Sequence, residues 1–239
     1  MTQEYTVLVG QTAYPVVVSD ERKALLAAKA AGRVFVGLMH REDSSTIDTG
    51  REEETLWEAE YLATSDAICP EYLERIVRRH LGLPWMIAET DRLILREFML
   101  EDIAQMPQEP EVWFTPEERE ADRIFYDAEK LEAYIKNQYR FYEYGIWAVV
   151  RKEDGIIVGK AGVTNAEMED ALELGYHIFE PYRRQGYAKE ACRAILHYAK
   201  QELDCPVSAR VAKENGASIH LLEQLQVPYH LLPLRSERG

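Results

Sequence analysis

The feature of this sequence that most constrains its fold is the direct succession of a strand, a basic turn and an amphipathic helix between Leu172 and Leu203. The apolar run from Leu172 to Phe179 predicts a strand, and Gly186 opens the helix that follows. That helix repeats small and apolar side chains at spacings of three and four residues, at Ala188, Ala191, Cys192, Ile195, Leu196 and Ala199. Because such a stripe packs against a sheet, the segment predicts an α/β arrangement.

The turn between this strand and helix has the composition of an anion-binding site. The first turn of a helix has free backbone N–H groups, and the helix dipole adds to their attraction for anions. Gly186 lets a phosphate approach the backbone closely, and Ala188 keeps a nearby position small. Basic side chains outnumber acidic ones locally, with Arg183, Arg184, Lys189 and Arg193 against Glu190. Taken alone, these residues leave open a solvated basic turn ahead of a core helix.

The overall composition sets outer limits on the protein class. The chain has 239 residues, near the size of two small domains, and 46% of them are hydrophobic, as in ordinary globular proteins. No apolar run approaches the roughly 18 residues of a membrane helix, and the first residues lack the pattern of a secretion signal. Cys69, Cys192 and Cys205 are too scattered for a disulfide framework or a zinc site. We therefore expect a cytoplasmic protein without a metal site or a membrane partner.

The formal net charge of −14 argues against nucleic acid as a general partner, because phosphate binding needs a basic surface. An acidic protein attracts cationic substrates at long range. Solubility alone also explains such a charge. The charge therefore leaves both interpretations open.

The first part of the chain alternates between predicted strands and helices, which indicates a small α/β domain. The expected strands are Tyr5–Val9, Pro15–Ser19, Val34–Met39 and Glu60–Thr64. A helix is expected over residues 21–31, with Asp20 as its N-cap, and a second over Pro70–His80. Residues 40–54 are polar and predict a loop.

The segment from Val17 to Gly32 is similar to a β-α-β piece of the haloacid dehalogenase-like (HAD-like) Rossmann fold. In that family an aspartate at a strand end helps to hold a metal, and its nucleophile is an Asp-x-Asp pair after the first strand. Gly10-Gln11-Thr12 stands in place of that pair. We therefore expect Asp20 to cap a helix rather than take part in catalysis.

A junction is predicted at Leu83-Pro84-Trp85, which divides the chain into domains of residues 1–86 and 87–239. The second domain is expected to begin with a strand at Thr90–Glu97, a helical region after Asp102, a charged stretch from Pro116 and a helix over Asp127–Tyr142. A hairpin of Ile146–Val150 and Ile156–Val163, turning at Asp154-Gly155, is expected next. The strand and helix described above follow, and then a strand at Ser208–Val211 and a helix at Ala217–Leu225.

Several motifs of this second domain, in the same order, resemble the GNAT superfamily of N-acetyltransferases, in particular its ribosomal-protein-alanine acetyltransferase-like branch. Arg183-x-x-Gly186-x-Ala188 after Leu172–Ile178 resembles the family's acetyl-CoA motif. The strand at Thr90–Arg96, the hairpin turning at Asp154-Gly155, and Asn215-x-x-Ser218 resemble its first strand, central hairpin and late motif.

The resemblance implies a mixed sheet that splays between the strand ending at Phe179 and the strand Ser208–Val211. It implies acetyl-CoA as cofactor, with pantetheine along Ile178 and its neighbours. The pyrophosphate would lie on the loop Arg183-Arg184-Gln185-Gly186-Tyr187-Ala188, and Asn215 would also contact the cofactor. The implied reaction is acetyl transfer by direct attack of an amine in a ternary complex, the amine belonging to a small molecule or a protein N-terminus.

The resemblance also suggests candidates for proton transfer. Glu173 would be the general base, or else a hydrogen-bonded strand residue. The family's usual acid, a tyrosine on the late helix, falls at Leu222, so Ser218 is the remaining hydroxyl, unless it caps or packs the helix. His177 either lines the acceptor side or packs in the core.

Two departures from the family pattern bear on function. Gln226-Val227 replaces the usual Gly-Phe, and residues 228–239 are too short for the final two-strand hairpin. Part of the acceptor wall would then be missing, or it would come from the N-terminal domain or from a second subunit of a homodimer. The alternative function is a non-catalytic acyl-CoA-binding regulatory module.

Overall fold

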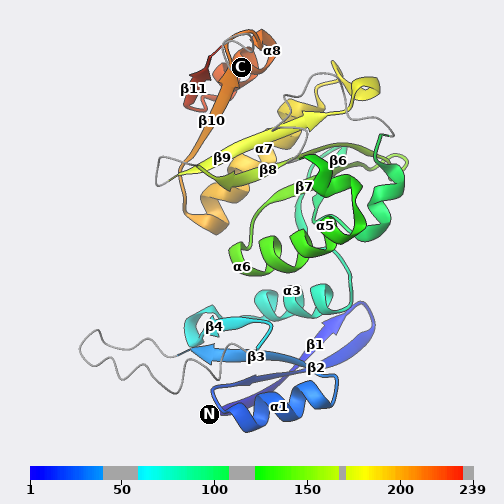
Figure 1. Ribbon diagram of the computed structural model, residues 1–239, viewed down its shortest axis with the longest axis vertical. Coiled ribbons are helices and arrows are strands. Elements are labelled where there is room, and N and C mark those ends of the chain that lie inside the picture. Colours follow the sequence, from blue (N-terminus) through cyan, green and yellow to red (C-terminus); the bar gives the residue numbers. More distant parts are fainter. Residues whose placement is uncertain (40–58, 108–121, 167–170, 234–239) are drawn as a thin grey trace, which may run out of the picture. The chain divides into compact units, whose positions relative to one another are not determined.

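The computed structural model describes residues 1–39, 59–107, 122–166 and 171–233 (Figure 1). The chain divides into two compact units, Met1–Trp85 and Met86–Gly239, each described here by itself. The predicted loop at residues 40–54 and the start of the predicted charged stretch at Pro116 lie outside the described residues.

The N-terminal unit is built on a sheet with strand order β1-β2-β3-β4. Its strands are β1 (Thr2–Val9), β2 (Thr12–Ser19), β3 (Val34–Met39) and β4 (Leu62–Thr64). β1 and β2 are antiparallel, whereas β2, β3 and β4 are parallel. Helices α1 (Arg22–Ala30) and α3 (Pro70–His80) cover opposite faces of this sheet, and a 3₁₀ turn, Ser65–Ala67, precedes α3 (Figure 1).

Both faces of the central strands are buried, which explains the continuous valine run of β2. Val16 and Val18 pack in a cluster with Leu73, Ile76 and Val77 of α3. Val17 faces the other way, towards Leu25 and Ala28 of α1. The predicted α/β layering of this unit is thus observed.

The predicted role of Asp20 as a helix cap is wrong. Helix α1 has Glu21 as its N-cap, without a side-chain cap hydrogen bond. The pairing of Thr2 with Ser19 brings the chain's first residue beside Asp20, whose carboxylate binds the amino group of Met1. An ammonium partner is stronger than a neutral backbone donor, so the carboxylate turns towards it.

The second unit is built on a sheet with strand order β11-β10-β9-β8-β7-β6-β5. The strands are β5 (Met86–Glu89), β6 (Leu93–Arg96), β7 (Ile146–Arg151), β8 (Ile157–Asn165), β9 (Leu172–Ile178), β10 (Val207–Ala212) and β11 (Tyr229–Leu232). β5 to β9 form an antiparallel succession, whereas β9, β10 and β11 are parallel. This mixed sheet matches the predicted class.

The strand predicted at Thr90–Glu97 is wrong in its first three residues. Thr90 forms a tight turn instead, since its backbone N–H donates to the carbonyl of Leu93 at 2.9 Å and its hydroxyl accepts from the Leu93 N–H at 2.9 Å. This turn joins β6 to β5, a strand of four residues that the sequence pattern did not reveal.

Two helical layers cover this sheet. Helix α7 (Tyr187–Tyr198) lies on one face and continues as a π-helical turn, Ala199–Leu203. The other face carries 3₁₀ segments at Leu100–Gln105 and Arg123–Tyr126 and a helical run of α5 (Ala128–Tyr134), a π-helical turn (Ile135–Tyr139) and α6 (Arg140–Tyr142) (Figure 1). The helix predicted over Asp127–Tyr142 is therefore confirmed, with Asp127 as its cap.

The sheet splits between β9 and β10. β8 and β9 pair along their length, from Asn165–Leu172 to Gly159–Ile178. Among the described residues, β10 pairs with β9 at Val207–Leu172 and Ser208–Glu173, and then turns away (Figure 1). The splayed sheet expected from the family resemblance is confirmed.

Helix α8 (Gly216–Leu225) follows β10, and β11 returns to pair with β10 in parallel. Within the described residues, a single strand therefore follows α8, where the family resemblance implies a hairpin. The predicted helix at Ala217–Leu225 is confirmed to within one residue.

Candidate functional site

The basic turn after β9 has a backbone shape that exposes the start of α7. A 3₁₀ turn, Glu180–Tyr182, follows the strand, and Gly186 is the N-cap of α7 with a φ of 84° and no side-chain cap. Arg184 also has a positive φ, of 60°. Left-handed conformations are strained for side chains other than glycine, by about 1–2 kcal/mol. The loop therefore holds an unusual shape, and the helix begins without a side-chain cap hydrogen bond.

The side chains of this loop divide into exposed and anchored groups. Arg184 and Gln185 are exposed, whereas the Arg183 Nε donates to the Ile178 carbonyl at 3.0 Å. Tyr187 is 6% exposed, so it contributes backbone rather than side chain to the surface. The predicted anion loop is thus a backbone feature flanked by arginines.

Arg92 holds this loop from a distant part of the sequence. Its Nη1 donates to the Gln185 carbonyl at 3.0 Å, and its Nε donates to a carboxylate oxygen of Glu190 at 2.7 Å. The Thr90 hydroxyl donates to the other oxygen of Glu190 at 2.6 Å. The Arg92 guanidinium also stacks 4.7 Å over the ring of Tyr187.

The carboxylate of Glu190 is stabilised by these contacts. Burial alone would raise the pKa of Glu190, but hydrogen bonds from Thr90 and Arg92 outweigh it and lower that pKa. Hydrogen bonds to Glu190 therefore connect the Thr90–Arg92 turn to the first turn of α7. Sequence reasoning missed this link because it counted Glu190 merely as one negative charge near the arginines.

The backbone of β9 presents an open edge where the sheet splits. The Phe179 N–H donates to the Val158 carbonyl, so the backbone of Phe179 faces β8. Because hydrogen-bonding directions alternate along a strand, Leu174, Tyr176 and Ile178 turn their backbone groups away from β8, towards the split. An extended, amide-containing ligand would find hydrogen-bond partners at Leu174 and Tyr176 and at the N–H of Ile178, whose carbonyl already accepts from Arg183.

Glu173 lies at the closed end of the split, beside Ser208 of β10. Its carboxylate accepts a hydrogen bond from the Arg210 Nε at 2.7 Å. Glu173 and Arg210 thus form an ion pair across the two strands, and one carboxylate oxygen is engaged before any substrate arrives.

The late-motif residues sit at the start of α8. The Asn215 side chain caps this helix by accepting from the Ser218 N–H at 3.1 Å. Leu222 is 1% exposed and belongs to the core. Ser218 is half-buried in the first turn of α8, and its hydroxyl stays a candidate acid, whereas position 222 is a core residue without a proton to donate.

A family model described as "Acetyltransferase (GNAT) domain" matches residues 92–227, which is more than half of the chain. The chain belongs to the GNAT family. Two curated relatives from Bacillus subtilis match parts of it: the uncharacterized protein YkkB, 30% identical over 91 residues, and the uncharacterized N-acetyltransferase YjdG, 31% identical over 81 residues. These stretches cover 37% and 33% of this chain, and 53% and 48% of the relatives, so the chain spans about half the length of the curated relatives it matches.

Solved structures also resemble the GNAT chain. An acetyltransferase from Agrobacterium tumefaciens is 22% identical with a TM-score of 0.43, covering 58% of this chain and 81% of its own. A ribosomal-protein-S5-alanine acetyltransferase from Vibrio fischeri is 16% identical with a TM-score of 0.45, covering 60% and 81%.

The GNAT domain also contains a buried polar cluster that sequence reasoning did not identify. Lys160 of β8 lies opposite His177 of β9, and its ammonium contacts the carboxylate of Asp122. Burial lowers the pKa of Lys160 to about 7, but the contact with Asp122 favours the charged ammonium, and we take the pair as charged. Burial, with the charges of Lys160 and Arg183, lowers the pKa of His177 to about 4.

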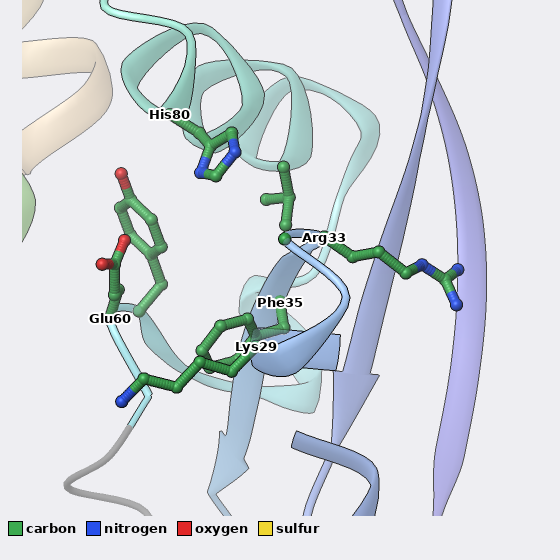
Figure 2. A pocket seen from close by; sticks show the side chains of 8 residues that line it. Lys29, Arg33, Phe35, Glu60 and His80 are labelled. Atoms are coloured by element: carbon green, nitrogen blue, oxygen red, sulfur yellow. The ribbon is translucent and has the colours of Figure 1, made fainter. Parts of the chain in front are cut away.

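A separate hollow lies in the N-terminal unit, with a volume of about 120 Å³ (Figure 2). Figure 2 shows His80, Glu60 and Lys29 around it, while Arg33 extends away from it. Arg33 instead pairs with Glu4 of β1 at 3.0 Å. This hollow belongs to the part of the chain before the residues matched by the GNAT model.

No helix in the described ranges combines the length and apolar character needed to cross a membrane. Within the same ranges, no three or more His, Cys, Asp or Glu side chains gather in a way that would hold a metal ion.

Proposed function

We propose that this protein is an N-acetyltransferase, which transfers the acetyl group of acetyl-CoA to an amine. The observation that carries the proposal is the open edge of β9, which leads to the uncapped start of α7 in a chain that belongs to the GNAT family. A strand edge suits the amides of pantetheine, and a helix start suits a pyrophosphate. The two features follow each other in the order in which these groups are joined in CoA.

Each part of the site has an expected role towards acetyl-CoA. The backbone of Leu174, Tyr176 and Ile178 pairs with the pantetheine arm. The loop Arg183–Ala188 binds the pyrophosphate with its backbone, assisted by the exposed Arg184. Asn215 keeps the start of α8 in place beside the cofactor.

In the proposed reaction the amine attacks the thioester directly, and Glu173 removes the amine proton, directly or through water. The need for a base depends on the amine. Deprotonation at neutral pH costs about 4–5 kcal/mol for a lysine-like amine and about 1 kcal/mol for an α-amino group. Because Arg210 engages one oxygen of Glu173, the site is better matched to an α-amine than to a lysine-like amine.

The acceptor belongs to one of four classes: a protein N-terminus, a polyamine-like molecule, an aminoglycoside-like molecule or an amino-acid derivative. The net charge of −14 favours a cationic acceptor over an anionic one. The free cysteines Cys69, Cys192 and Cys205 support a reducing, cytoplasmic location.

The test combines cofactor binding with turnover. Acetyl-CoA is titrated while thermal stability is followed, and free CoA release is then measured with a representative of each amine class. A stability shift together with turnover on one class supports the proposal. No shift contradicts it, and a shift without turnover on any amine identifies a cofactor-binding module instead.

Gly186→Val tests the loop assignment. Its φ of 84° disfavours a β-branched residue, and a Cβ there would lie 3.3 Å from the Arg92 Nη2. We expect the variant to lose the shift caused by acetyl-CoA. Gly32→Ala is the matched control, because Gly32 also has a positive φ but stands in the N-terminal unit with no atom near its added Cβ. Equal affinity in Gly186→Val and wild type would remove the loop from the site.

A further inference from the structure

An ion pair joins β9 and β10 at the point where the two strands separate. The Arg210 Nε donates to a carboxylate oxygen of Glu173 at 2.7 Å. Glu173 is in the last pair that the strands form among the described residues, with Ser208, and Arg210 is two residues further along β10. Because side chains alternate along a strand, Glu173, Ser208 and Arg210 are on one face of the sheet.

This face is the one away from α7. Glu173 shares its side of β9 with His177, which is paired with Lys160 of β8. The Lys160 ammonium is 4.8 Å from the centre of the Phe125 ring, which belongs to the helical layer opposite α7. The ion pair is therefore separated by the sheet from the helix whose start is expected to bind the pyrophosphate.

A small polar molecule could reach both charges of this pair. The side chains of Glu173 and Arg210 are 18% and 38% exposed. Gly175 is the next residue on the same face of β9, and among the described residues a Cβ there would meet only the Ile146 Cδ1, at 3.4 Å. Glu173 also directly precedes Leu174, whose backbone faces the split. The pair thus lies beside a strand surface without a side chain, next to the expected position of the thioester.

The two charges match the charges of an α-amino acid. An exposed ion pair adds little to stability, so stability alone is a weak reason for this one. An α-amino acid carries an ammonium and a carboxylate on one carbon atom. When it lies against the ion pair in the opposite order, its ammonium meets Glu173 and its carboxylate meets Arg210. A polyamine or a protein N-terminus has no carboxylate beside its amine and would leave the Arg210 side unmatched.

We propose that the acceptor is a free α-amino acid, whose ammonium is bound by Glu173 and whose carboxylate is bound by Arg210. The inference rests on the acetyl transfer proposed above and names its substrate class. A guanidinium suits this role because its fork of N–H donors fits a carboxylate. Of the five donors of Arg210, the bond to Glu173 uses Nε.

Arg210 would also make the amine easier to deprotonate. The carboxylate of a free amino acid raises the pKa of the neighbouring ammonium, because a nearby negative charge favours the charged form. A guanidinium bound to that carboxylate offsets its charge and lowers the pKa of the amine again. Glu173 then takes one proton from the ammonium and passes it to water.

Atoms and charges balance in the resulting transfer. The amine nitrogen forms a bond to the thioester carbon, the carbon–sulfur bond breaks, and its electron pair stays on the sulfur. The sulfur takes up the second proton that the nitrogen loses. Acetyl-CoA and the amino acid thus become CoA thiol, the N-acetylated amino acid and one released proton.

The test compares free amino acids with their amides, which keep the α-amine but lack the carboxylate. Release of CoA is measured with a panel of L-amino acids and with the amide of each. We expect the wild type to have a kcat/KM for its best amino acid roughly tenfold or more above that for the amide, because a charge-assisted hydrogen bond is lost. The amide also represents a peptide N-terminus.

Arg210→Gln shows whether this preference comes from Arg210. It should lower kcat/KM for the amino acid roughly 10- to 100-fold, mainly by raising KM, and should change the value for the amide much less. Arg210→Lys should restore part of the preference, since it keeps the charge without the fork. The control is Lys136→Gln, which breaks an exposed ion pair with Glu132 and should leave both values unchanged.

A purely structural role of Arg210 would lower the rates on amino acid and amide equally, and that outcome would overturn the inference. So would a wild type that uses amides as well as amino acids, a result that does not depend on how well the variants fold. Both leave the proposed function intact. Failure of the wild type to bind acetyl-CoA or to acetylate any amine would instead contradict the proposed function itself.

Discussion

Arg92 connects segments of the chain that are almost one hundred residues apart in sequence. It joins the β5–β6 turn to Glu190 and to the carbonyl of Gln185, and so it fixes the shape of the anion loop without belonging to the motif. A binding loop must be held to within a fraction of an ångström to be effective. We therefore propose that Arg92 positions the loop for the cofactor.

Replacing Arg92 with alanine should weaken acetyl-CoA binding roughly tenfold, because the loop loses the side chain that holds its backbone. Arg92→Lys should recover part of the affinity, since it keeps the charge but not the forked geometry. Isothermal titration with acetyl-CoA measures both. The control is Arg33→Ala, which breaks the ion pair with Glu4 in the N-terminal unit and should leave the affinity unchanged.

His177 makes stability depend on pH. Its pKa of about 4 in the folded protein is below the ordinary value of 6.5, so the unfolded chain takes up the proton first as the pH falls. Stability should therefore decline from pH 6.5 to about 4, by about 3 kcal/mol in total. Urea unfolding across this range should show the decline in wild type and a smaller slope in His177→Gln.

A matched control for this effect is His220→Gln, because His220 is exposed on α8. That variant should keep the wild-type slope. Equal slopes in His177→Gln and wild type would show that the ring is not the group that titrates.

At the residue scale, the sequence motif predicted the anion loop but not the distant side chain that holds it in place. Arg183 to Ala188 are contiguous, and their pattern follows from local backbone chemistry. Arg92 becomes a candidate site residue only through its tertiary contacts with Gln185 and Glu190. In the sequence, Arg92 falls within the predicted strand Thr90–Glu97, and nothing there marks it as a contact of the loop.

Helix α8 shows how the chain accommodates a departure from its family. Gln226 stands where the family usually has glycine, and it takes the left-handed conformation at the C-cap with a φ of 57°. Val227 follows and is 5% exposed, so it fills a core position. The helix therefore ends in the same manner, but with a strained residue.

Gln226→Gly should relieve this strain and raise the free energy of unfolding by about 0.5–1 kcal/mol. The corresponding rise in thermal midpoint is about 1–4 °C, measurable by calorimetry. Ala217→Gly in the first turn of the same helix is the control and should lower stability instead. A loss of stability in both variants would show that the side chain of Gln226, rather than its backbone, matters at the C-cap.

Most elements were predictable from periodicity and capping signals, and the exceptions have physical causes. Strand β5 was not predicted, because four residues are too few to show an alternating pattern. Thr90 was predicted as a strand residue, but its side chain closes a turn. Asp20 looked like a cap, but β1 brings an ammonium group to it. Only for Asp20 did a partner from another strand outweigh the local preference, whereas β5 and Thr90 differ for local reasons.

At the scale of the whole molecule, the GNAT model matches only residues of the second compact unit. The site residues lie between Arg92 and Ser218, all within the second unit. The similarity of the segment Val17–Gly32 to HAD-like folds stays a prediction. We therefore expect direct protection by a bound cofactor within the second unit.

Acetyl-CoA at about 100 times its Kd should stabilise the folded second unit by about 2.7 kcal/mol. Hydrogen exchange should slow in β9 and in the first turn of α7, where backbone N–H groups gain partners. The amides of β2 and β3 in the N-terminal unit serve as internal control and should exchange as before. Slower exchange confined to β2 and β3 would contradict the proposed site, because it would place acetyl-CoA binding in the N-terminal unit.

The short pairing between β9 and β10 has a mechanical consequence. β10, α8 and β11 are attached to the rest of the sheet near Leu172 and Glu173, at one end of the split. Ile178 is five residues further along, about 16 Å at the rise of a strand, so a rotation of about 5° at the attachment changes the width of the split by about 1.4 Å there. We therefore expect the short β9–β10 pairing to act as a hinge for β10, α8 and β11. Substitutions at Val207 or Ser208, far from the anion loop, should set how fast CoA leaves.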